Sequence, residues 1–380
     1  MERAEVVIVG GGVHGASIAY HLARKGLRDV LVLERDRLGS GSTSRNAGGV
    51  RLQFSSEINV RLSQRSISHW ENFKEEMGVD PEFRQVGYLF LITTDRDVTA
   101  FDRSLELWRR LNVPARKIDA AEVQRLVPDL RTDDVRFATY CTKDGYLDPT
   151  ALLNGYVARA RELGVRFREA APVTGITRER DTVRSVTTAG GDIACRIVVN
   201  AAGPWAGQIG AMAGLDVPIT PLRRQIFVTD PVPGLPRDFP LTVEMATSFY
   251  FHRESGGVLM GMADPADKPG FDDSVNWDFL PTIVERALDR MPLLERANVK
   301  TGWAGFYEDT PDKHPIIGKV ESLPGFVFAA GFSGHGLMHA PATGEAVAEL
   351  IVDGHTTLDI SALSFERFAR GQLIREHNVI

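Results

Sequence analysis

Cysteine is scarce in this sequence. Only Cys141 and Cys195 occur among the 380 residues, which excludes a disulfide framework and a cysteine-ligated metal cluster. We therefore predict no metal site and expect a protein of the reducing cytoplasm.

Long apolar runs are also lacking. No stretch of about 18 or more apolar residues occurs, so we expect no membrane span. The chain enters an apolar strand at Val6, which leaves no room for the charged region, apolar stretch and cleavage site of a signal peptide. These features predict a soluble protein.

Positive charge is in deficit. The 44 Lys and Arg residues against 50 Asp and Glu residues give a formal net charge of -6. Nucleic-acid-binding proteins usually carry a basic face, so the composition argues against nucleic acid as a partner and against a tRNA-modifying role. An anionic cofactor must then be held by local basic groups or by the backbone.

What the sequence does contain begins with a β-α-β pattern. Val6–Val9 is typical of a strand buried on both faces, and Val30–Leu33 is typical of a second one. Between them, apolar residues recur at helical spacing from Ala16 to Ala23. The turn after the first strand is rich in glycine.

The glycines of this turn predict a dinucleotide site. Gly10, Gly12 and Gly15 fit G-x-G-x-x-G, which permits a tight turn, close approach of backbone to pyrophosphate, and close packing of helix on strand. The helix N-terminus then favours the anion. Glu34 ends the second strand, where a carboxylate can accept the ribose hydroxyls and would repel a 2′-phosphate. NADP is disfavoured, while FAD and NAD both remain.

The pattern along the chain predicts an α/β protein, α+β overall, with two domains. A Rossmann-like cofactor domain is built from the discontinuous segments 1–80, 145–220 and 305–380. Residues 81–144 and 221–304 form a substrate domain with a large, mostly antiparallel β-sheet flanked by helices. We expect the last helix to run from Ala340 to Val352, after a glycine turn.

Five motifs carry a resemblance to a known family. They are the Gly10–Gly15 unit, the Ser42–Arg51 loop, Asn200–Trp205, Thr310–Asp312 with Pro315–Gly318, and Gly331–Gly336 continuing to Pro341–Glu345. With them the sequence resembles the flavin-dependent amine and amino-acid oxidoreductases of the D-amino-acid-oxidase superfamily. It is most similar to the branch of the sarcosine oxidase and proline dehydrogenase β-subunits. The resemblance implies that the dinucleotide is FAD.

The turn, the loop and the C-terminal segment together supply the predicted FAD site. Its residues are Gly10, Gly12, Val13, His14, Gly15, Glu34, Arg35, Ser42, Thr43, Ser44, Arg45, Asn46, Ala47, Gly48, Val173, Ala201, Ala202, Gly203, Trp205, Gly305, Gly331, Gly334, His335, Gly336, Leu337 and Met338. The helix after Gly336 is expected to stabilise negative charge that develops at flavin N1 and C2=O during hydride transfer.

Three residues are predicted to act on the substrate. Arg51 matches the family position that faces the substrate carboxylate, where a bidentate contact would fix the orientation of the α-carbon. Tyr250 is expected to orient the amine or the carboxylate. His335 is expected either to take part in proton transfer or to hold its loop. Arg223 and Arg224 could assist, although two adjacent arginines before a strand are more often one buried, paired residue and one solvated residue. The role of His252 stays open.

Some family positions differ here. The cysteine that links flavin in monomeric sarcosine oxidases is Gly305, and no histidine lies in the Ser42–Gly49 loop, so we expect noncovalent FAD. The carboxylate-binding lysine of those oxidases is Met338. Their oxygen-activating lysine would fall near Leu259, which favours an electron-acceptor protein over oxygen.

The predicted function is oxidation of a small amino acid or secondary amine, such as sarcosine, proline or a glycine-like compound, by hydride transfer from the α-carbon to flavin N5. Electrons pass to oxygen or to an acceptor protein. A basic pocket beyond one arginine would instead favour a 2-hydroxy-acid or glycerol-3-phosphate dehydrogenase. A third hypothesis is that the chain is one subunit of a multi-chain amine dehydrogenase and is inactive alone. The partner would then be a second subunit or another copy of this chain.

Overall fold

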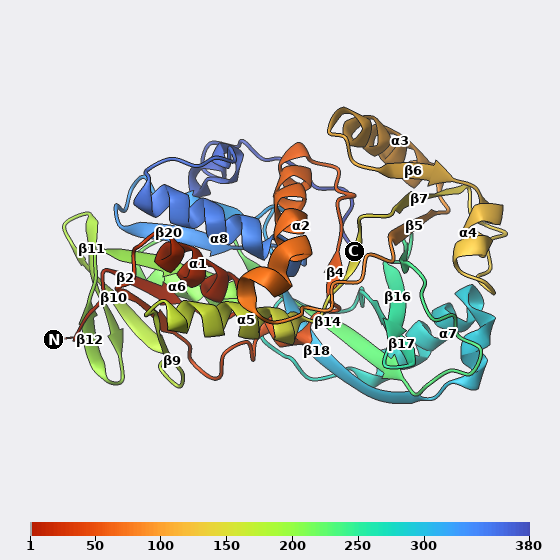
Figure 1. The fold of residues 1–380 in the computed structure, drawn as a ribbon, viewed down its shortest axis with the longest axis horizontal. Coiled ribbons are helices and arrows are strands. Elements are labelled where there is room, and N and C mark those ends of the chain that lie inside the picture. Colours follow the sequence, from red (N-terminus) through yellow and green to blue (C-terminus); the bar gives the residue numbers. More distant parts are fainter. Residues whose placement is uncertain (1) are drawn as a thin grey trace.

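The protein is built around two large β-sheets that lie side by side (Figure 1). The structure is a computed structural model that describes residues 2–380. The eight α-helices of this range are α1 (Val13–Arg24), α2 (Glu57–Met77), α3 (Asp95–Arg110), α4 (Ala120–Leu126), α5 (Pro149–Glu162), α6 (Ala206–Met212), α7 (Leu280–Arg290) and α8 (Gly336–Val352). The expected α/β class is confirmed.

The first sheet has six strands and a parallel core. In spatial order they are β19 (Ile316–Lys319), β20 (Phe326–Ala330), β13 (Ile197–Asn200), β2 (Val6–Val9), β3 (Val30–Leu33) and β9 (Arg166–Arg168). Only β19 runs antiparallel to its neighbour. The central strands are short apolar runs buried throughout. Helices α1 and α8 cover one face, and a four-stranded sheet within residues 2–194 covers the other together with α6. Their carboxyl ends lead into the turns that begin at Gly10, Glu34, Ala201 and Gly331.

Helices α1 and α8 pack together on this sheet at close range (Figure 1). A Cβ at Gly344 of α8 would lie 2.1 Å from Ser17 Oγ of α1, so only glycine fits there. Ser17 Oγ also donates a hydrogen bond of 2.9 Å to the carbonyl of Ala340. The two helices are therefore fixed relative to each other, and so are their N-termini.

The second sheet has eight strands and is mostly antiparallel. In spatial order they are β18 (Val299–Asp309), β14 (Thr220–Thr229), β17 (Gly257–Met262), β16 (Phe249–Glu254), β15 (Leu241–Glu244), β5 (Tyr88–Ile92), β7 (Phe137–Cys141) and β6 (Ala115–Ile118). Alternation along the strands divides it into two faces. Phe227, Phe249 and Phe251 pack in the core cluster that includes α7. Arg224 and Tyr250 lie on the opposite face, toward the six-stranded sheet.

Two smaller sheets complete the fold. A four-stranded sheet contains β1 (Glu2–Arg3), β12 (Gly191–Ala194), β11 (Thr182–Thr188) and β10 (Val173–Glu179), and β4 (Gly49–Val50) pairs with β8 (Gly145–Tyr146). The β4–β8 pair ties the loop after Ser42 to the start of α5.

One expected element begins elsewhere. Helix α8 starts at Gly336, not at Ala340, and continues through Pro341. Proline lacks an N–H and usually marks a helix boundary, but here the helix is buried and held by α1. Tertiary packing thus extends the helix to the glycine turn.

The division into a discontinuous cofactor domain and a substrate domain remains our proposal. The strands of the six-stranded sheet fall within 1–80, 145–220 and 305–380. Those of the eight-stranded sheet fall within 81–144 and 221–304, except that β14 begins at Thr220 and β18 ends at Asp309. Within residues 2–380, no helix has the length and apolarity that crossing a bilayer requires.

Candidate functional site

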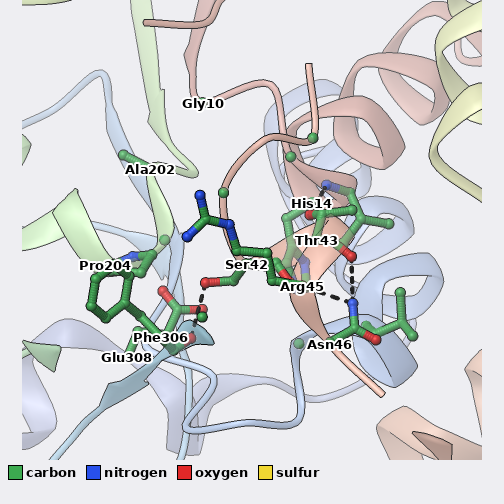
Figure 2. A pocket seen from close by; sticks show the side chains of 18 of the residues that line it. Gly10, His14, Ser42, Thr43, Arg45, Asn46, Ala202, Pro204, Phe306 and Glu308 are labelled. Atoms are coloured by element: carbon green, nitrogen blue, oxygen red, sulfur yellow. Dashed lines mark hydrogen bonds between the residues drawn. The ribbon is translucent and has the colours of Figure 1, made fainter. Parts of the chain in front are cut away.

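A large cavity lies between the two sheets. Its volume is about 910 Å³, at the upper end of the range for small-molecule sites. One wall comes from the carboxyl ends of the six-stranded sheet and the other from the face of the eight-stranded sheet that lies opposite α7. Figure 2 shows the pocket from close by, with Ser42 and Arg45 beside Pro204, Phe306 and Glu308.

The glycine turn before α1 forms one end of this cavity. Gly10 has a φ of 112°, and a Cβ there would lie 2.3 Å from the carbonyl oxygen of Ala201. A Cβ at Gly15 would lie 2.0 Å from the carbonyl oxygen of Gly10, so helix and strand touch at this point. The N-cap residue, Gly12, has no side chain to cap the helix. Val13 N donates a hydrogen bond of 3.0 Å to Thr43 Oγ1, so the N–H groups of His14 and Gly15 are those left for an anion.

Glu34 is held in place by the backbone around it. Its Oε2 accepts a hydrogen bond of 2.8 Å from Gly11 N, and its Oε1 accepts one of 2.9 Å from Asp36 N. Next to it, the guanidinium of Arg35 lies 3.6 Å from the ring centroid of Trp205. This pair forms a flat apolar and cationic wall beside the carboxylate.

The loop after Ser42 contacts strand β18 of the eight-stranded sheet. Ser42 Oγ donates a hydrogen bond of 2.9 Å to the carbonyl of Phe306 (Figure 2). Arg45 donates one of 3.0 Å to the carbonyl of Ala304 and forms an ion pair with Asp273. A Cβ at Gly305 would lie 3.0 Å from Arg45 Cβ. The loop is thus fastened to strand β18 at the middle of the cavity.

The second helix N-terminus in the cavity is that of α8. Gly336, Leu337 and Met338 line the wall, and His335 precedes them at the N-cap position. His14 of α1 stacks on Phe332 with ring centroids 3.7 Å apart. Two helices therefore point their positive ends into the same space.

Arg51 is a buried cation without an anionic partner. Its side chain is 1% exposed, and its guanidinium lies 3.9 Å from the ring centroid of Phe54. The polar partners are two backbone carbonyls: Nη1 donates to Gln53 O at 2.7 Å and Nη2 to Asn378 O at 2.6 Å. No carboxylate of residues 2–380 forms an ion pair with it. Three of its five N–H groups remain for a ligand in the cavity that it lines.

Three tyrosines surround the same part of the cavity. Tyr88, Tyr250 and Tyr307 line the wall, and burial raises the pKa of each phenol. They are therefore neutral hydrogen-bond donors near neutral pH. Glycines make room for two of the rings: a Cβ at Gly261 would lie 2.5 Å from Tyr250 Oη, and a Cβ at Gly334 would lie 2.4 Å from Tyr307 Cε2.

The histidines of the cavity are neutral. Burial lowers the pKa of His14 to about 3 and that of His335 well below its ordinary value, and the charge of Arg51 lowers the latter further. Burial also raises the pKa of Glu308, which lines the wall, to about 7. Arginines thus carry most of the fixed charge in the part of the cavity that the three tyrosines surround.

Most residues predicted for the site lie on the wall of this one cavity, including Arg51, Tyr250 and His335. Those absent from the lining, within the chain described, are Gly15, Ser44, Gly48 and Gly331. Gly15, Gly48 and Gly331 permit close backbone packing, because a Cβ at any of them would clash with a neighbour.

The imidazole of His252 is held by two backbone carbonyls and an aromatic ring. Its Nε2 lies 2.9 Å from the carbonyl of Ala47, its Nδ1 lies 2.8 Å from that of Arg253, and its ring stacks on Tyr146. It holds the Ser42 loop against β16.

Sequence reasoning missed several wall residues. Tyr88, Tyr307, Glu308 and Ile226 come from strands whose pairing brings them together across the sheet. For Tyr307 the available signal was Gly334, since a glycine in a turn often marks a close approach and a Cβ there would lie 2.4 Å from the Tyr307 ring. Residues 2–380 contain no cluster of three or more His, Cys, Asp or Glu arranged to hold a metal.

The chain is similar to known proteins along nearly its whole length. Residues 5–350 match the DAO family, described as FAD dependent oxidoreductase. The Xenopus laevis protein named FAD-dependent oxidoreductase domain-containing protein 1 is 34% identical over 431 residues, which cover 100% of this chain and 85% of that protein. The mitochondrial dimethylglycine dehydrogenase of Rattus norvegicus is 32% identical over 392 residues, which cover 97% of this chain but only 45% of that protein.

A solved structure shares the whole fold. The crystal structure of L-proline dehydrogenase from P. horikoshii superimposes with a TM-score of 0.92 at 37% sequence identity. The match covers 98% of this chain and 99% of that one.

Proposed function

The chain belongs to the DAO family of FAD-dependent oxidoreductases, and within that family we propose that it oxidises a small amino acid or secondary amine at the α-carbon. The cofactor is FAD. Sarcosine, proline and glycine-like compounds are the substrates that the motifs favour. The buried, unpaired charge of Arg51 is the observation that carries this proposal.

The residues of the cavity fit FAD. The N–H groups of His14 and Gly15 at the N-terminus of α1 would receive the pyrophosphate, and the Glu34 carboxylate would accept the ribose hydroxyls. The Ser42 loop, Gly305 and the N-terminus of α8 would border the flavin ring. Attachment is proposed to be noncovalent, because position 305 is glycine and both cysteines lie outside the cavity wall that the structure describes.

When bound, FAD would supply a two-electron acceptor for a hydride from the substrate α-carbon; the amine nitrogen would lose a proton to water, and the resulting imine would hydrolyse. Arg51 binds the substrate carboxylate and so fixes the direction of the α-C–H bond. The N-terminus of α8 stabilises negative charge at the pyrimidine end of the ring.

Tyr250 and His335 have supporting roles in this proposal. Tyr250 donates a hydrogen bond to the substrate carboxylate or contacts its amine. His335 is neutral because of burial, and a neutral imidazole with so low a pKa is a poor proton acceptor. We therefore assign His335 a positioning role at the entrance to α8 and require the substrate amine to react in its neutral form.

Anaerobic mixing with candidate substrates tests the proposal. The FAD-loaded protein is mixed with glycine, sarcosine, proline, hydroxyproline and D-amino acids while flavin absorbance is followed. Bleaching by at least one amine is expected. If every amine leaves the flavin oxidised, the proposed function is wrong.

The electron acceptor and the location of the protein are further parts of the proposal. Leu259 is buried among Ile226 and Val228, and this absence of a lysine supports an acceptor protein over oxygen. Equal steady-state rates in air and with an artificial acceptor would contradict that choice. A cytoplasmic location is proposed, to be checked by fractionation, and a second subunit would be revealed by co-purification.

A second function deserves testing because Arg224 also lines the cavity. Two cations at the substrate end are compatible with a 2-hydroxy acid or with glycerol 3-phosphate. Bleaching by lactate or glycerol 3-phosphate, and not by amines, would establish this alternative.

A further inference from the structure

Arg224 is a second cation in the cavity without an acidic partner. It lies on β14 and lines the same wall as Arg51, and its one hydrogen bond within residues 2–380 runs from Nη1 to the carbonyl of Arg223 at 2.8 Å. Its buried Nε has no hydrogen-bond partner within residues 2–380. The neighbouring Arg223 differs sharply, since its guanidinium pairs with Asp267 and Asp272.

Tyr307 links Arg224 to Arg51. The Arg224 guanidinium lies 4.8 Å from the ring centroid of Tyr307. Both arginines are near enough to this phenol to lower its pKa by their charge, against the larger opposing effect of burial. Tyr250 is influenced by Arg224 in the same way. The two cations therefore flank one tyrosine-lined space.

We propose that Arg224 binds a second carboxylate of the substrate, so that the substrate class is amino dicarboxylates. This rests on the proposed function, in which Arg51 binds the first carboxylate next to the reacting carbon. The second carboxylate is carried either on the nitrogen substituent or on the side chain.

Charge balance favours two carboxylates over other ligands. Two separate guanidinium groups, each with one positive charge, match two separate single negative charges. A phosphate ester concentrates its charge in one group and would leave the other arginine unpaired. A neutral side chain would leave the charge of the Arg224 guanidinium without a counter-charge.

Matched pairs of substrates test the inference on the FAD-loaded protein. Iminodiacetate is compared with sarcosine, and glutamate with norvaline, by kcat/KM for anaerobic flavin reduction. We expect the dicarboxylate of at least one pair to be preferred by about 10- to 100-fold, the effect of one charge-assisted hydrogen-bonded pair. The pair in which the dicarboxylate is preferred shows whether the second carboxylate is carried on the nitrogen substituent or on the side chain. Equal kcat/KM values in both pairs would overturn the inference.

The variant R224Q should reduce this preference by about tenfold or more, and R224K should keep part of it. K300Q is the matched control, because Lys300 is an exposed cation on β18 outside the cavity wall; its preference ratio should equal that of the wild type. A fall in kcat/KM for both members of a pair alike, or a loss of FAD affinity in R224Q, would instead assign Arg224 to the cofactor.

Binding provides a readout that does not need turnover. Succinate or glutarate should raise the Tm of the FAD-loaded wild type more than butyrate does, and R224Q should abolish the difference. If no amine bleaches the flavin yet this difference is found, the oxidation proposal fails while the second anion site stands. If amines bleach the flavin and the difference is absent, the second anion site fails alone.

Discussion

The end of the cavity at the six-stranded sheet is made mostly of backbone, whereas the end at the eight-stranded sheet is made of side chains. At the first end, glycine turns and two helix N-termini present N–H groups, and Glu34 is held by backbone donors. At the second end, Arg224 and the three tyrosines project from strands of the eight-stranded sheet, and Arg51 lines the same space from the segment that follows β4. Backbone geometry suits a constant cofactor, and side chains can be exchanged to suit a substrate.

The largest expected effect is on the backbone end. G10A forces a Cβ to within 2.3 Å of the Ala201 carbonyl at a φ of 112°. We expect loss of FAD binding and of most folded protein, measured by flavin content and thermal melting. G26A is the control: Gly26 has a φ of 94° but open space around it, so it should cost only about 1 kcal/mol of stability and keep FAD. Equal flavin content in the two variants would contradict this.

Removing the charge of Arg51 should impair substrate binding at the end of the cavity made of side chains. We expect R51Q to lower kcat/KM for flavin reduction by about 100- to 1,000-fold, because a bidentate charged contact is lost, and R51K to recover only part of it. FAD content should stay near that of the wild type, which separates the two ends of the cavity. R61Q, which removes an exposed arginine of α2, should change kcat/KM by less than about twofold. A loss below tenfold in R51Q would place the substrate elsewhere.

Glu308 lines the cavity wall, and its ionisation should make the unfolding free energy depend on pH. Its folded pKa of about 7 exceeds the ordinary 4.5, so the folded protein binds more protons between these values. Its contribution to stability is present below about pH 4.5 and is lost as pH rises through 7, a change on the order of 3 kcal/mol. E308Q should remove this decline in the unfolding free energy of the FAD-free protein. An unchanged pH profile in E308Q would show that Glu308 ionises normally.

The smallest expected effect on kcat/KM is that of Tyr250, at the end of the cavity made of side chains. Y250F removes one hydroxyl and leaves the ring in the space provided by Gly261. A reduction of about 3- to 10-fold in kcat/KM is expected, the value of one neutral hydrogen bond, with Tm nearly unchanged. Wild-type kinetics in Y250F would remove the tyrosine from the site.

The same contrast explains what the sequence could predict. The Gly10–Gly15 turn and Glu34 are local patterns, so their positions followed from spacing along the chain. Arg51 was found through the family resemblance, although its burial and its contact with the Asn378 carbonyl depend on the far end of the chain. Its lack of an anionic partner could not be seen before folding.

The missed parts depend on long-range packing. Strand β18 was not predicted, because Gly302 and Gly305 lower its strand propensity. Those glycines leave room for neighbouring side chains, since a Cβ at Gly302 would lie 2.6 Å from the Phe227 ring. Without β18 the register that brings Tyr307 next to Arg224 could not be derived.

A crystal structure of the FAD-loaded protein with 2-methylalanine tests the central claim most directly. This amino acid has no α-hydrogen and cannot donate a hydride, so the complex should persist. The account predicts both carboxylate oxygens within about 2.7–3.2 Å of Arg51 nitrogens, with the α-carbon facing flavin N5. A carboxylate bound away from Arg51 would contradict it.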